Sequence, residues 1–72
     1  MTYELTSAEK LEIVNQHLKN IEYSIFNLSL SVVEEESTST PNSETISNLN
    51  IQISQANAKK TALLAQLSEL EA

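Results

Sequence analysis

The chain has 72 residues, with ten acidic side chains, four lysines, no arginine, no glycine and no cysteine. Its net charge of −6 has the wrong sign for holding a phosphate backbone, so nucleic acid is not an expected partner. The lack of cysteine excludes disulfides and thiolate metal ligation, and the lack of glycine excludes the glycine-rich loops that bind nucleotide phosphates.

The first predicted element is a helix over about residues 7–35. Thr6 stands three residues before Glu9, which is the spacing of a capping box that satisfies free amides at a helix start. Apolar residues then recur at intervals of three and four, so that one side chain lies on the same helical face every turn. The acidic run from Glu34 to Glu36 opposes the helix macrodipole near the C-terminus and favours the end of the helix there.

A turn is predicted over about residues 36–42, because serine, threonine and the only proline gather there. Two ways of starting the next helix remain open. Thr40 can serve as the N-cap with Pro41 in the first helical position, or Asn42 or Ser43 can be the cap instead.

The second helix is predicted over about residues 43–70. Residues 26–32 and 49–54 offer a competing interpretation, since apolar and polar residues alternate there with the period of a strand. Two such strands flanked by helices would give an α+β unit. The three-four spacing continues through both windows, and a strand would break its phase, so we favour two helices.

The apolar positions of the two helices form one packing seam. A short turn makes the helices antiparallel, and one register pairs the whole seam, from Leu11 opposite Leu70 to Val32 opposite Leu49. The predicted fold class is therefore all-α, a coiled-coil-like antiparallel two-helix hairpin forming a single domain over residues 1–72. The seam consists of Leu11, Val14, Leu18, Ile21, Ile25, Leu28, Val32, Ile46, Leu49, Ile53, Ala56, Lys60, Leu63, Leu67 and Leu70.

Lys60 is the one charged residue in the seam, and the predicted register places it opposite Ile21. A lone polar residue at a core position can fix register or oligomeric state at some cost in stability. Alternatively, its aliphatic stem packs along Ile21 while its ammonium reaches Glu22 or solvent, which is the interpretation that we favour.

Further apolar residues lie away from the seam, in a second stripe on the first helix and a smaller patch on the second. With this stripe, the C-terminal half of the first helix is apolar nearly all round, and a helix of that kind is normally buried. This surplus suggests dimerisation into a four-helix bundle, docking on a larger protein, or capture of a different protein. The predicted interaction surface consists of Tyr23, Phe26, Leu30, Val33, Ile51, Ala58, Ala62 and Ala65.

No pattern of residues predicts a catalytic or metal site. His17 is the only histidine, and its neighbours on the same helical face are Ile13, Val14, Asn20 and Ile21, none of which is a strong metal ligand. The glutamates are too dispersed to nominate an acid–base pair or to imitate a phosphate ladder. We expect a protein that is not an enzyme, with no cofactor, no metal and no small-molecule substrate.

The sequence contains no secretory signal pattern and no apolar stretch of membrane-spanning length. We therefore expect a soluble intracellular or virion-associated protein that is neither secreted nor membrane-spanning. A chain of this size has difficulty burying enough apolar surface alone, so its expected partner is itself, as a homo-oligomer, or a larger protein assembly.

Two resemblances accompany these patterns. The hairpin architecture resembles the plasmid-encoded Rop-like hairpins that dimerise into four-helix bundles, although Rop-like RNA binding needs a basic face that this chain lacks. The segments LTSAEKL (residues 5–11), PNSETI (41–46) and NIQI (50–53) resemble small helical-hairpin proteins of tailed phages. The second resemblance implies a virion component or assembly accessory, and it assigns no functional residues.

Overall fold

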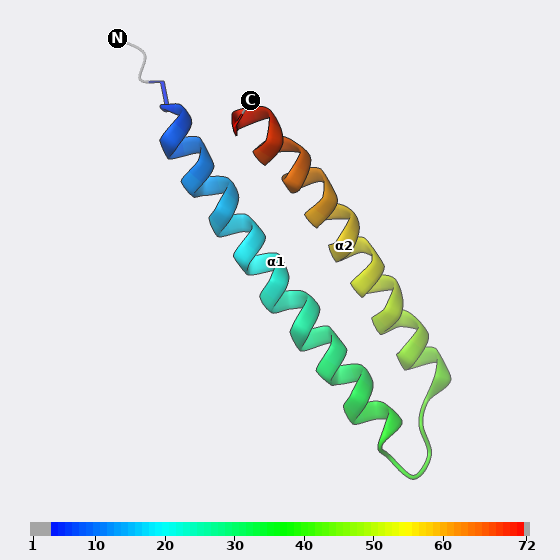
Figure 1. The fold of residues 1–72 in the computed structure, drawn as a ribbon. Helices are drawn as coiled ribbons and strands as arrows, with labels where there is room; N and C mark the ends of the chain where they lie inside the picture. The colour runs from blue at the N-terminus through cyan, green and yellow to red at the C-terminus, as the bar shows by residue number, and fades with distance from the viewer. Residues whose placement is uncertain (1–3, 72) are drawn as a thin grey trace.

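The computed structural model describes residues 4–71, which form two long helices joined by a short turn (Figure 1). Helix α1 spans Ser7–Glu36 and helix α2 spans Ser43–Glu71, and the described part of the chain contains no strand. The predicted all-α hairpin is confirmed. The strand interpretation of residues 26–32 and 49–54 is wrong, because both windows lie inside helices.

The two helices lie side by side and antiparallel, so that the start of α1 and the end of α2 are at the same end of the molecule (Figure 1). The hairpin is a rod with extents of 60 × 20 × 16 Å. Of the predicted domain, residues 1–3 and 72 lie outside the described residues.

The start of α1 is the predicted capping box. The Thr6 hydroxyl oxygen accepts a hydrogen bond from the backbone amide of Glu9 at 3.1 Å, and the Thr6 amide donates to the Glu9 carboxylate at 2.9 Å. These reciprocal bonds satisfy two amides that a helix cannot satisfy by itself. The first turn of α1 is thus fixed by side chains that are local in the sequence.

Hydroxyl side chains complete the other end of α1. The Ser37 amide donates to the Val33 carbonyl at 3.1 Å, and the Ser37 hydroxyl donates to the Glu34 carbonyl at 2.8 Å. The Thr38 hydroxyl donates to the Glu35 carbonyl at 2.9 Å. Ser37 has φ −85° and ψ −4°, and no residue among those described has positive φ. The helix therefore ends without the left-handed residue that commonly closes a helix.

The N-cap of α2 is Asn42, not Thr40. The Asn42 side-chain oxygen accepts from the Thr45 amide at 3.0 Å, and its backbone carbonyl accepts from the Ile46 amide at 3.1 Å. The Asn42 amide in turn donates to the Glu35 carboxylate at 2.9 Å. This places a charge from the unfavourable end of the α1 dipole at the favourable end of the α2 dipole. The Glu35 carboxylate thereby helps to close the turn.

The seam lies along the contact between α1 and α2. Every residue of the predicted seam is half-buried, whereas most other described residues are exposed. None of the residues from 4 to 71 is fully buried. Two helices can enclose only a single row of side chains, so the core of the hairpin is this one seam.

Serines that suggested strands are accommodated within α1 by hydrogen bonds along the helix. The Ser29 hydroxyl donates to the Ile25 carbonyl at 2.9 Å, and the Ser31 hydroxyl donates to the Asn27 carbonyl at 3.1 Å. Such bonds to the preceding turn satisfy a hydroxyl inside a helix without breaking the backbone pattern. The alternation of polar and apolar residues in this window therefore occurs within a helix.

We expect Leu18→Asp to unfold the hairpin. The substitution removes a leucine from the seam and puts a carboxylate in its place, which should cost about 2–5 kcal/mol, a large part of the stability of a small domain. Circular dichroism during urea unfolding measures this loss. The matched control is Asn20→Asp at an exposed site of α1. An unchanged unfolding midpoint for Leu18→Asp would show that the seam is not the core.

We expect Asn42→Ala to lower the free energy of unfolding by about 1 kcal/mol, because it removes the cap that satisfies the Thr45 amide. Thermal unfolding followed by circular dichroism measures the change. Asn48→Ala, at an exposed site within α2, is the control and should be neutral or slightly stabilising, since alanine favours the helix interior. Equal effects of the two substitutions would contradict the capping role.

Candidate interaction surface

The predicted second stripe of α1 is exposed along its whole length. Its side chains are accessible to 60% at Tyr23, 63% at Phe26, 43% at Leu30 and 58% at Val33. At the helical repeat of 3.6 residues per turn, these four residues are centred about 150° around α1 from the seam. We call them the outer stripe, because they lie on the side of α1 that faces away from α2.

The predicted patch on α2 is also exposed, with Ile51 accessible to 53% and Ala58, Ala62 and Ala65 in the exposed class. This patch is centred about 170° around α2 from the seam. The two predicted surfaces therefore lie on opposite edges of the hairpin. The fold does not join them into one continuous surface within a single chain.

Three further large apolar residues are exposed and were not part of the predicted surface: Leu5, Ile13 and Leu64. Ile13 and Leu64 each stand next to a seam residue in the sequence, so subtracting the seam positions would have identified them. They lie apart from the outer stripe. Single exposed apolar residues are ordinary on a protein surface.

A shallow open depression lies at the N-terminal end of the outer stripe, lined by Lys19, Glu22, Tyr23 and Phe26. These positions have the spacing i, i+3, i+4 and i+7, like the four residues that surround a hole in coiled-coil packing. Sequence reasoning based on apolar residues missed Lys19 and Glu22. In coiled coils, a hole with this spacing receives one side chain of the neighbouring helix.

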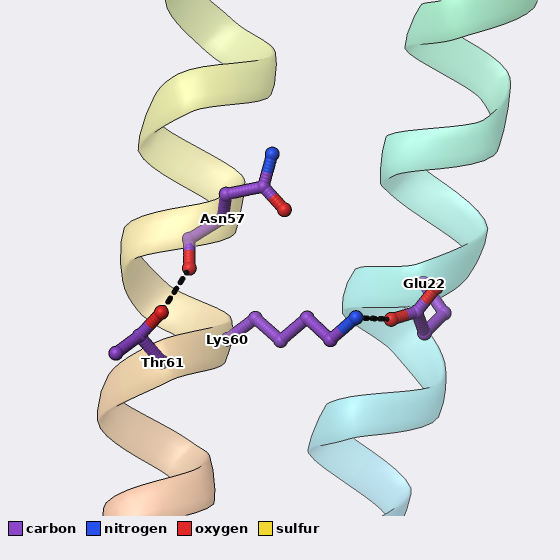
Figure 2. A network of polar contacts seen from close by, with 4 residues as sticks. All are labelled: Glu22, Asn57, Lys60 and Thr61. Carbon is purple, nitrogen blue, oxygen red and sulfur yellow. Dashed lines mark hydrogen bonds and ion pairs between the residues drawn. The ribbon is translucent and has the colours of Figure 1, made fainter.

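An ion pair crosses the hairpin beside this depression. Figure 2 shows Lys60 extending from α2 towards α1, where its ammonium contacts the carboxylate of Glu22. The Lys60 side chain is 37% exposed and that of Glu22 is 54% exposed, so the charges remain at the surface while the stem of Lys60 lies in the seam. The prediction that Lys60 reaches Glu22 is confirmed. A bond within α2, from the Thr61 hydroxyl to the Asn57 carbonyl at 3.0 Å, lies nearby (Figure 2).

Residues 4–71 contain no group of three or more histidine, aspartate or glutamate side chains placed to hold a metal ion. Neither helix, over the residues described, is long and apolar enough to cross a membrane. Comparisons with protein-family models, curated proteins and solved structures give no match to the chain. The exposed apolar surface is the most distinctive feature of the described residues.

We expect Lys60→Leu to raise the free energy of unfolding by about 1 kcal/mol. An exposed ion pair contributes about 0–1 kcal/mol, whereas burial of a leucine side chain contributes about 1.5–3 kcal/mol. Urea unfolding measures the difference, and light scattering records the oligomeric mass of both proteins so that stabilities are compared at equal states of association. Lys59→Leu at the exposed neighbouring site is the control and should give no gain. A loss of stability in Lys60→Leu would show that the ion pair outweighs seam packing.

Proposed function

We propose that the chain is a non-enzymatic protein–protein interaction module that works through helix packing, either as a homo-oligomer or as part of a larger protein assembly. The outer stripe is the observation that carries this proposal. It is a continuous row of four large apolar residues, each at least 43% exposed, on a helix whose opposite face already packs against α2. Contiguous apolar surface of this kind is typical of interaction sites.

A partner can bury the apolar area of the outer stripe that the hairpin itself leaves exposed. Complete burial of a large apolar side chain contributes about 1.5–3 kcal/mol, and the outer stripe retains a substantial part of this in its exposed area. Association must also offset the loss of translational and rotational freedom. A partner that covers the whole stripe at once, as a packed helix does, meets both requirements.

A second candidate function is a regulatory adaptor or inhibitor that binds a different protein through the outer stripe. Tyr23 and Phe26 favour it, because they are the most exposed residues of the stripe and aromatic side chains are frequent anchors of interfaces. Such a helix would lay its apolar face into a groove of its target. A virion or assembly component, suggested by the phage resemblance, falls within the first proposal.

We expect Phe26→Asp to disrupt association while leaving the hairpin folded, since Phe26 is 63% exposed and lies outside the seam. Light scattering should show a dimer or larger oligomer for the wild type and a smaller mass for the variant. Circular dichroism checks that both are equally helical. Ile13→Asp is the matched control, because it adds the same charge at a 46% exposed apolar site of α1 outside the stripe.

Two results would change these assignments. A wild-type chain that is monomeric at concentrations on the order of 100 µM, which corresponds to an association weaker than about 5.5 kcal/mol, would rule out self-association. Membership of a larger assembly and the adaptor would then remain. An oligomer whose mass is unchanged by Phe26→Asp would rule out the outer stripe as its contact.

A further inference from the structure

We propose that the occupant of the outer stripe is a second copy of the chain, docked with its α1 antiparallel to the first. In this arrangement Val33 of each copy enters the depression lined by Lys19, Glu22, Tyr23 and Phe26 of the other. The inference rests on the proposed function and adds the partner, the orientation and the register. Three independent features of α1 support it.

The first feature is that the outer stripe is self-complementary in spacing. Its residues are separated by three, four and three positions, an order that reads the same in both directions. A two-fold axis at the level of residue 28 therefore places Tyr23 opposite Val33 of the second copy and Phe26 opposite Leu30. Each large side chain then has an apolar counterpart, as a closed symmetric dimer requires.

The second feature is the position of the depression. Its four lining residues are centred between Glu22 and Tyr23, which is the level of Val33 in the antiparallel register. An exposed side chain of one copy thus meets a hole of the other, and the two-fold axis repeats the contact at the far end of the stripe. This is the packing of knobs into holes that holds coiled coils together.

The third feature is the distribution of charge at the two ends of the stripe. Lys19 lies one turn before Tyr23, and the antiparallel register places it beside Glu34 and Glu36 of the second copy. Within the described chain, none of these three side chains forms an ion pair. A parallel dimer would instead place Lys19 against its own copy and the glutamates against one another, so charge favours the antiparallel orientation.

Glu22 is the charge that needs a separate account, because the same register brings it near Glu34 and Glu36 of the second copy. Its carboxylate already contacts the ammonium of Lys60 (Figure 2). The ion pair therefore offsets the repulsion at this edge of the contact. Lys60, a residue of α2, contributes to a contact made by α1.

The resulting assembly differs from a square four-helix bundle. Because the outer stripe faces away from α2, the two copies of α1 lie together in the centre and each α2 lies outside. The four helices form a row, with α1 packed on both sides. Each α1 uses its seam within the hairpin and its outer stripe between copies.

Cross-linking of introduced cysteines tests the register, since the chain has no cysteine of its own. In the antiparallel dimer Asn27 lies across from Asn27 of the second copy. Asn27→Cys should form a cross-linked dimer with a bis-maleimide that spans the roughly 8–10 Å between packed helices. Asn20→Cys is the control on the same helical face, and its two copies lie about 24 Å apart along the axis at 1.5 Å per residue.

A mixture of Asn20→Cys and Glu34→Cys chains should cross-link, because the register places these two sites across from each other. In the Asn27→Cys chain, Phe26→Asp should lower the cross-linked fraction by on the order of tenfold or more. Only a modest loss of binding free energy is needed for such a change, because the dissociation constant depends exponentially on it. Ile13→Asp should leave it unchanged. Light scattering of the uncross-linked chain gives the oligomeric mass in the same samples.

The outcomes separate this inference from the proposed function. Cross-linking of Asn20→Cys as efficient as that of Asn27→Cys would overturn the antiparallel register. An oligomer by light scattering that Asn27→Cys fails to cross-link would overturn the contact through the outer stripe but leave self-association standing. A monomer would overturn both the contact between copies and self-association, and it would leave binding to a different protein as the proposed function.

Discussion

The packing of α1 against α2 along one seam is the constraint on which the rest of the structure depends. A hairpin of two helices has no interior beyond the row of side chains between them, which is why all seam residues are half-buried and none of the described residues is fully buried. Most helical stability in proteins comes from burial of an apolar face, so each helix depends on the other. The contact between Lys60 and Glu22 requires this alignment, because it joins the two helices.

Sequence periodicity predicted the hairpin because the three-four spacing is a property of each helix alone. The capping box was predictable for the same reason, since Thr6 and Glu9 are neighbours in the chain. The choice of Asn42 as the cap of α2 was not, because it depends on where the carboxylate of Glu35 lies once α1 has ended. Likewise, the glutamate run predicted a weakened end of the first helix. The hydrogen bond from the Asn42 amide to the Glu35 carboxylate, which uses one of these charges, forms only when the turn is folded.

The apolar residues of the candidate surface were predictable from the sequence, but the depression at its end was not. Removing the seam from the sequence leaves the outer stripe, because exposure of a helix face follows from the helical repeat. The depression could not be identified in this way, since two of its four lining residues, Lys19 and Glu22, are charged. A hole between side chains is set by their spacing on the helix, whatever their polarity. A selection of apolar residues from the sequence therefore omits such a hole.

The turn without glycine has a consequence for the unfolded chain. Glycine in a turn permits left-handed backbone, but it also gives the unfolded chain extra freedom that folding must remove. Here hydroxyl groups and Asn42 satisfy the helix ends with ordinary negative φ angles, and Pro41 further restricts the unfolded backbone. The turn therefore loses less conformational entropy on folding than a glycine turn of the same length, which matters in a protein whose core is a single row of side chains.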